Sequence, residues 1–217
     1  MEESFRFDEE IYENAITIDL SNVANKASAL YSISKRTMDI VSSLVGLILL
    51  SPLFLLVAIL IKLDSKGPII FKQIRIGKNS KPFYIYKFRS MKIDAPNLST
   101  EEFINASDFT TKVGKFIRKT SIDELPQLVN ILKGDMSLVG PRPPIPREVI
   151  QYNKYQYQRL LVKPGITCYW QISGRNNIDF DEWVELDLKY IKERNLFKDI
   201  YIILMTLPVL LGDKNAS

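Results

Sequence analysis

The residues with the clearest chemical potential are two adjacent acids, Asp123 and Glu124, with arginines before and after them. Arg118 precedes the acids, and Arg142 follows them in the sequence Gly-Pro-Arg-Pro. Guanidinium forks and exposed backbone amides are suited to binding a diphosphate. A carboxylate beside them could bind a metal ion, act as a nucleophile, or do both. The sequence therefore predicts a phosphate site within residues 118–142.

The same acids also permit a structural interpretation. Ser121 and Glu124 fit a helix capping box, and apolar residues follow at helical spacing, namely Leu125, Leu128, Val129 and Leu132. We expect a helix to begin near Ser121, with Pro126 in its first turn. Acids at the start of a helix commonly cap it, so Asp123 and Glu124 taken alone are more often structural.

The composition narrows the available chemistry. The chain has no histidine and a single cysteine, Cys168. This excludes catalysis with histidine as the base, zinc sites of the usual kind and an internal disulfide framework. Carboxylate, lysine, tyrosine and hydroxyl chemistry remain, with a hard cation such as Mg²⁺ as the expected metal. We interpret Cys168 as a small buried residue rather than a reactive thiol.

Charge is distributed unevenly along the chain. Residues 1–33 hold seven acidic and two basic residues, whereas the remainder holds 27 basic and 18 acidic residues. We interpret the acidic segment as an extension without a catalytic role. A basic body favours an anionic partner such as nucleic acid, lipid headgroups or a phosphate-bearing substrate. No nucleic-acid-binding motif is visible, so we expect no nucleic-acid partner.

An uncharged apolar run covers residues 40–61, which is close to the roughly 20 residues needed to cross a bilayer. Ser51 and Pro52 lie at its midpoint, and proline in a helix interior predicts a bend there. Basic residues flank both ends, namely Lys35, Arg36, Lys62 and Lys66. The positive-inside rule then favours neither orientation. These features leave open both a spanning helix and a re-entrant hairpin.

Two short aromatic and β-branched runs follow, at residues 69–71 and 83–88, and predict short strands. Basic residues are interspersed through this region, among them Lys72, Arg75, Lys78, Lys81 and Lys92. A solvated basic surface beside anionic lipid explains most of them. Lys87 and Arg89 are better site candidates, because they lie among residues that favour burial.

The remaining segments carry weaker patterns. Residues 94–111 are polar, and we expect a mobile segment over the site. Residues 181–195 predict a helix with an apolar face for packing, formed by Val184, Leu188 and Ile191. Residues 200–211 are apolar but too short to span a membrane and are interrupted by Pro208, so we expect them to lie at the bilayer surface.

Taken in order, these motifs resemble one known family. They are Lys35-Arg36 with Asp39, Ser51-Pro52, residues 62–68, Lys-Phe-Arg-Ser-Met at 87–91, Asp-Glu-Leu-Pro-Gln-Leu at 123–128, residues 134–143 and Lys-Pro-Gly-Ile-Thr at 163–167. Over about residues 35–211 the chain resembles the bacterial sugar transferases, also called monotopic phosphoglycosyl transferases. The ordered set is specific, although each piece alone is weak.

The resemblance implies an α/β, mostly helical fold. Residues 34–66 would form a re-entrant membrane helix hairpin, broken at Ser51-Pro52. Residues 67–217 would form a small cytoplasmic catalytic domain with short strands, surface amphipathic helices and a C-terminal helix at the membrane interface. The chain would then lie at the inner (cytoplasmic) membrane, with its catalytic domain on the cytoplasmic face.

The resemblance also implies a reaction that starts surface-glycan assembly. A sugar 1-phosphate passes from a nucleotide diphosphate sugar to polyprenyl (undecaprenyl) phosphate. Asp123 would be the nucleophile that forms a covalent phosphosugar intermediate and a ligand of Mg²⁺, with Glu124 as its partner. Lys87, Arg89, Arg118 and Arg142 would bind substrate phosphate, and a helix N-terminus would help keep Asp123 ionised.

The sequence Tyr-Trp-Gln-Ile-Ser-Gly-Arg at 169–175 is similar to that of exopolysaccharide and capsule enzymes, and it suggests Gln171 and Arg175 as part of a nucleotide-sugar pocket. A UDP-hexose or UDP-N-acetylhexosamine is the expected donor, and the sequence does not indicate which sugar it carries. Whether the chain forms a homo-oligomer stays open. The alternative is a membrane-tethered basic scaffold without catalysis, which explains the charge but not the clustered motifs.

Overall fold

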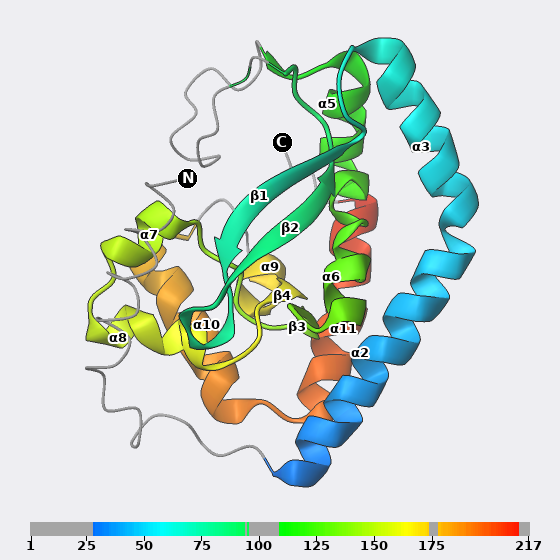
Figure 1. Cartoon of the computed structure of the whole chain (residues 1–217). Coiled ribbons are helices and arrows are strands. Elements are labelled where there is room, and N and C mark those ends of the chain that lie inside the picture. Colours follow the sequence, from blue (N-terminus) through cyan, green and yellow to red (C-terminus); the bar gives the residue numbers. More distant parts are fainter. Residues whose placement is uncertain (1–27, 94, 96–108, 174–177, 213–217) are drawn as a thin grey trace.

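A computed structural model describes residues 28–93, 95, 109–173 and 178–212, the last six of these by their backbone only. The chain is mostly helical with four short strands among the described residues, as expected for the predicted α/β class. Two long helices run along one side of the molecule, and the remaining elements pack against them (Figure 1). The acidic extension up to residue 27 and most of the segment predicted to be mobile lie outside the described residues.

The apolar segment forms two helices, α2 (Ala29–Leu49) and α3 (Ser51–Asp64), which meet at an angle of 60°. Pro52 lies in the first turn of α3, and the Ser51 hydroxyl donates to the Ile48 carbonyl at 2.8 Å. The predicted break at Ser51-Pro52 is therefore confirmed. Helix α2 begins well before residue 34, because the Ser28 hydroxyl accepts a hydrogen bond from the Tyr31 amide and caps it.

The relation of this pair to a membrane stays a prediction. Among the described residues, no single helix is both long enough and apolar enough to cross a bilayer. The bent pair of α2 and α3 meets those requirements only when its two helices are counted together. Length and composition alone therefore do not separate a broken span from a re-entrant hairpin.

Strands β1 (Ile70–Ile76) and β2 (Pro82–Phe88) form an antiparallel hairpin, which confirms both predicted strands and extends the first. Phe71 pairs with Lys87, and Arg75 pairs with Phe83. Alternate residues of a strand share one face, so Arg75 and Lys87 belong to the same face of the hairpin. This face carries the cationic side chains toward the predicted site.

Helix α5 (Lys112–Lys119) is followed by a 3₁₀ turn, η2 (Ile122–Glu124), and by helix α6 (Gln127–Lys133). The predicted helix start at Ser121 is wrong, because Ser121 has the left-handed conformation, with φ of 54°, and its side chain caps nothing. The helix begins only after Pro126, whose missing N–H suits that position. Asp123 and Glu124 therefore lie in a separate tight turn.

Helix α6 is bound to the edge of the hairpin by one buried side chain. The Asn130 amide donates to the Tyr84 carbonyl at 2.7 Å, and its oxygen accepts from the Tyr86 amide at 3.0 Å. Strand β2 is the edge at which these backbone groups would otherwise lack partners. This contact sets the position of β2 relative to the turn that precedes α6.

Two further short strands, β3 (Ser137–Val139) and β4 (Gly165–Thr167), run parallel. Their ends approach so closely that a Cβ atom on Gly165 would lie 2.1 Å from the Gly140 nitrogen. The Gly165 amide donates to the Pro141 carbonyl at 2.9 Å. Glycine is thus required at position 165, because any side chain there would collide with the Gly-Pro-Arg-Pro loop.

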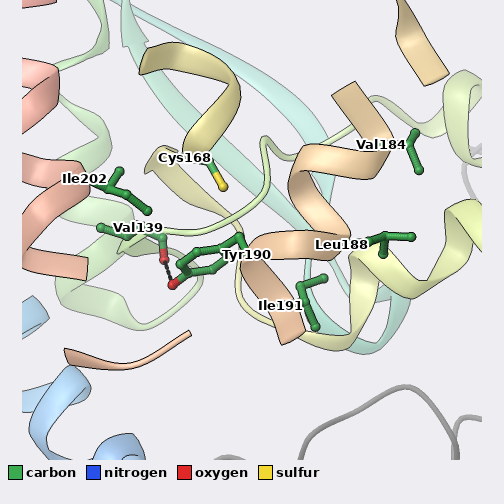
Figure 2. Close-up of a cluster of buried hydrophobic side chains, with 7 residues drawn as sticks. All are labelled: Val139, Cys168, Val184, Leu188, Tyr190, Ile191 and Ile202. Carbon is green, nitrogen blue, oxygen red and sulfur yellow. Dashed lines mark hydrogen bonds between the residues drawn. The ribbon is translucent and has the colours of Figure 1, made fainter. Parts of the chain in front are cut away.

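The C-terminal half adds helices around these strands: α7 (Pro146–Ile150), α8 (Lys154–Tyr157), η3 (Gln158–Leu161), α9 (Tyr169–Ile172), α10 (Phe180–Glu193) and α11 (Leu196–Gly212). Figure 2 shows the largest apolar cluster among the described residues, in which Val184, Leu188 and Ile191 of α10 are buried, as predicted. Cys168 is also fully buried there, and burial raises the pKa of its thiol. Both predictions are confirmed.

Helix α2 is fixed to the rest of the chain by polar side chains. Arg36 donates to the Ile131 carbonyl at 2.7 Å and to the next carbonyl of α6 at 2.8 Å. Asp39 accepts from the Leu138 amide at 2.9 Å. Nearer the start of α2, Lys35 pairs with the fully buried Asp199 of α11 at 3.0 Å. The long helices and the smaller elements are therefore one connected unit.

We expect Asn130→Ala to destabilise the chain, because it leaves the Tyr84 carbonyl and the Tyr86 amide without their partner. Unsatisfied buried groups cost about 1–3 kcal/mol each, which corresponds to a fall in Tm of roughly 4 °C or more for a chain of this size. Thermal unfolding of the detergent-purified chain, followed by circular dichroism, measures this. The control is Asn153→Ala, which removes an exposed cap of α8. Equal losses in the two variants would contradict the role given to Asn130.

Candidate active site

The two acids lie in the turn between α5 and α6, next to the end of β2. Lys87 of β2 reaches this turn, and its Nζ atom lies 2.6 Å from Glu124 Oε1. Both side chains are partly exposed, with relative accessibilities of 25% and 32%. The structure therefore brings Lys87 and Glu124 together in an ion pair that solvent or a substrate can reach.

Asp123 has a mixed electrostatic environment. The pKa of its carboxyl is raised to about 6, because burial and the charge of Glu124 raise it by more than Lys87 and Arg118 lower it. The expectation that a helix N-terminus favours the ionised form is wrong here, because α6 begins only at Gln127. The nearby cations, rather than a helix dipole, support the charged carboxylate.

Arg118 and Arg142 are both half-buried. In the part of the chain that the structure describes, neither guanidinium donates a hydrogen bond or forms an ion pair. Arg118 is close enough to Asp123 to lower its pKa. Partly buried guanidiniums without acceptors are suited to bind the oxygens of an anion. The geometry is therefore compatible with the phosphate-binding role predicted for both residues, which no contact in the structure tests.

Arg75, which the sequence interpretation assigned to a solvated surface, lies buried beside the loop that carries Arg142. Its side chain is buried, and it donates to the Pro143 carbonyl at 3.0 Å and to the Gln73 side chain at 2.7 Å. Burial and the charge of Arg142 lower the pKa of Arg75 to about 10. Glu124 is near enough to oppose that shift. The signal that could have indicated its position is the pairing of the two strands, because the hairpin register places Arg75 on the same face as Lys87.

Arg89 lies against the end of α3. It is buried, and its guanidinium donates to the Lys66 carbonyl at 2.6 Å and to the Ser65 carbonyl at 2.7 Å. These carbonyls lie just beyond the end of α3, where backbone acceptors lack helical partners. The donors of Arg89 are thus largely used to hold the end of α3, and its role in phosphate binding stays a prediction.

The proposed nucleotide-sugar residues are only partly described. The Gln171 oxygen accepts from the Cys168 amide at 3.2 Å and caps α9, and the side chain is buried. Its described contact is therefore structural, and a role in the pocket stays a prediction. Arg175 lies outside the described residues.

The described side chains near Asp123 offer few ligands for a metal ion. Among the described residues, no group of three or more His, Cys, Asp or Glu side chains could hold a metal ion. Mg²⁺ commonly uses one or two protein carboxylates together with substrate phosphates and water. Asp123 and Glu124, adjacent and partly exposed, fit that mode.

Comparison with known proteins shows which family the chain resembles. Residues 30–213 match the family described as bacterial sugar transferase. The galactosyl transferase CpsE of Streptococcus agalactiae is 50% identical over 82% of this chain and 42% of that protein. The undecaprenyl-phosphate galactose phosphotransferase of Salmonella typhimurium is 42% identical over 88% of this chain and 42% of that protein.

The exopolysaccharide production protein ExoY of Rhizobium meliloti is 38% identical over 81% of this chain and 84% of that protein. The chain therefore spans less than half the length of CpsE and of the Salmonella protein, and most of the length of ExoY. It belongs to the bacterial sugar transferase family. The resemblance inferred from the ordered motifs is confirmed.

The contrast between Arg118 and Arg89 can be tested with matched variants. We expect Arg118→Met to weaken binding of inorganic pyrophosphate by about tenfold or more, because a charge-assisted hydrogen bond contributes about 1.5–3 kcal/mol. Its Tm should change little. Arg89→Met should lower the Tm, because it leaves two carbonyls without donors. Isothermal titration and thermal unfolding on the same preparations give both values. A stable Arg89→Met variant with weakened pyrophosphate binding would reverse the assignment.

Proposed function

We propose that the chain transfers a sugar 1-phosphate from a nucleotide diphosphate sugar to undecaprenyl phosphate or a similar polyprenyl phosphate. The observation that carries this proposal is the turn holding Asp123 and Glu124, with Lys87 paired to Glu124 and with Arg118 near Asp123, an arginine that has no acceptor among the described residues. Family membership supports it, since relatives carry names such as UDP-glucose:undecaprenyl-phosphate glucose-1-phosphate transferase in Escherichia coli. Another relative is named for N-acetylgalactosamine phosphate transfer. These names support a UDP-hexose or UDP-N-acetylhexosamine as the proposed donor.

The reaction proceeds in two displacements with Asp123 as the nucleophile. In the first, a carboxylate oxygen of Asp123 attacks the phosphorus that carries the sugar. The bond to the bridging oxygen breaks, and the nucleoside monophosphate leaves. In the second, an oxygen of the polyprenyl phosphate attacks the same phosphorus, forms the diphosphate and releases the Asp123 carboxylate. The aqueous and lipid substrates thus use one site in turn.

The surrounding residues lower the cost of bringing a carboxylate to an anionic diphosphate. Arg118 and Arg142 bind phosphate oxygens, and Lys87 offsets the charge of Glu124. Glu124 acts as the partner of Asp123 in proton or metal handling. Mg²⁺ held by Asp123 and Glu124 together with the diphosphate would supply further charge neutralisation.

We also propose that the chain lies on the cytoplasmic face of the inner membrane, with α2 and α3 re-entrant and α11 at the interface. Large apolar side chains are exposed along these helices, including Leu44, Ile48, Leu49, Leu55, Leu63, Phe197 and Leu204. Clustered exposed apolar surface of this kind marks a membrane or protein contact. Residues 67–217 then form the cytoplasmic catalytic domain.

Transfer can be measured by incubating membranes that contain the chain with radiolabelled UDP-sugars and Mg²⁺, then extracting the lipid. We expect label in the lipid fraction with at least one sugar, and we expect Asp123→Asn to reduce it to background. The amide cannot form the phosphosugar intermediate, while its size preserves the fold. Asp181→Asn, an exposed acid-to-amide change at the start of α10, is the control and should retain transfer.

Two outcomes would count against the proposal. Lipid labelling retained in Asp123→Asn would refute the nucleophile assignment. Absence of labelling with UDP-glucose, UDP-galactose and both N-acetylhexosamines would favour the alternative of a membrane-tethered scaffold. Release of nucleoside monophosphate by each donor identifies the sugar.

The topology can be tested with single cysteines, because the native Cys168 is fully buried. We introduce Ser32→Cys in α2 and Lys66→Cys beyond α3, both at exposed positions. In a re-entrant arrangement both ends stay cytoplasmic, so neither cysteine reacts with a membrane-impermeant maleimide in intact cells. Both should react in inverted membrane vesicles. Labelling of Lys66→Cys from outside the cell would show that the pair spans the membrane.

A further inference from the structure

The Arg142 side chain rests against an indole ring. Its guanidinium carbon, Cζ, lies 5.3 Å from the ring centroid of Trp183, a residue of α10. A guanidinium placed over an aromatic face is attracted to the ring and keeps its N–H groups directed outward. Within the described part of the chain, these N–H groups have no acceptor. Trp183 thus fixes Arg142 without using its donors.

Trp183 is itself held in place by a second guanidinium. Arg159 Cζ lies 5.0 Å from the same ring centroid. Arg159 is buried, donates to Asp187 at 2.8 Å and donates to the Tyr152 hydroxyl at 2.7 Å. The ring of Trp170 packs on Trp183 with 5.0 Å between centroids. Movement of the indole would therefore disturb a buried ion pair.

The backbone that carries Arg142 is fixed from the other side. Arg75 donates to the Pro143 carbonyl, and the Ile76 amide donates to the Pro144 carbonyl, each at 3.0 Å. The loop therefore has little freedom at the residues that follow Arg142. With the backbone fixed by β1, the remaining freedom of Arg142 lies in its own long side chain. The contact with Trp183 restricts that freedom.

We propose that Trp183 is a positioning residue, which orients Arg142 for the diphosphate of the donor before the donor binds. This rests on the function proposed above and adds a residue to it. Long flexible side chains lose conformational entropy when they are immobilised by a ligand, so an already ordered arginine binds more tightly. Trp183 touches none of the reacting groups and acts only through Arg142.

The test compares Trp183→Leu and Trp183→Phe with Phe180→Leu. Phe180 belongs to the same aromatic cluster and lies near Arg159 and Trp183, whereas the ring that Arg142 contacts is that of Trp183. Its variant removes a ring from the cluster without removing the one that holds Arg142. All variants are purified as full chains in detergent, and their Tm values establish that they are folded.

Two quantities are measured: the Kd for UDP in the presence of Mg²⁺, by titration calorimetry, and the steady-state constants for transfer. We expect Trp183→Leu to raise the Kd for UDP and the KM for the donor by about fivefold to tenfold, within the range of cation–π contributions. The kcat should change less than twofold. Trp183→Phe should restore most of the affinity, because phenylalanine retains an aromatic face. Phe180→Leu should leave the Kd within about twofold of the original value.

A double variant separates positioning from general damage to the fold. If Trp183 acts through Arg142, then Trp183→Leu should have little further effect on the Kd for UDP in an Arg142→Ala chain. An equal loss in both backgrounds, an unchanged Kd in a folded Trp183→Leu chain, or no binding of UDP by the original chain would overturn the inference. Absence of sugar transfer with intact UDP binding would overturn the proposed function alone.

Discussion

The Asn130 amide joins α6 to the backbone of β2 on both sides of Ile85, and the arrangement of the site depends on it. Lys87 directly follows Tyr86, whose amide Asn130 binds. Glu124 lies in the turn that leads into α6. Because β2 and α6 are held at a fixed spacing, Lys87 Nζ lies 2.6 Å from Glu124 Oε1. The flexible lysine side chain then loses less conformational entropy when the ion pair forms. The side-chain amide of Asn130 thus brings two separate chain segments close enough for Lys87 and Glu124 to form an ion pair.

The tight turn before α6 imposes a second constraint. A longer helix would have pointed the Asp123 carboxyl along a helix surface and stabilised its charge at a helix N-terminus. In the 3₁₀ turn this carboxyl is instead half-buried, and its pKa is raised to about 6, with burial as the largest cause. Burial alone would favour the neutral acid, which is a poor nucleophile. Lys87 and Arg118 therefore have a definite electrostatic role, since they shift the balance back toward the carboxylate.

Local chemistry explains which features the sequence predicted. Pro52 lacks an N–H, so the helix break followed from one residue, and the aromatic and β-branched runs predicted the hairpin directly. The prediction of a helix start near Ser121 was wrong because Ser121 adopts a left-handed conformation, which depends on how α5 ends. The contacts of Arg75 and Arg89 could not be predicted for a related reason. Both are arginines in or beside short strands, and only tertiary packing places Arg89 against the end of α3 and Arg75 beside the Gly-Pro-Arg-Pro loop.

The polar contacts of the bent helix pair give its apolar surface a fixed relation to the site. Near one end, Arg36 binds the last carbonyls of α6. At the other end, Asp64 accepts from the Val113 amide at 2.9 Å and so caps the start of α5, while Arg89 joins the end of α3 to β2. Helices α5 and α6 flank the turn with Asp123, so the pair is tied to both sides of the proposed nucleophile. A lipid phosphate at the apolar surface would then meet Asp123 at a depth determined by the fold, rather than by the length of a flexible tether.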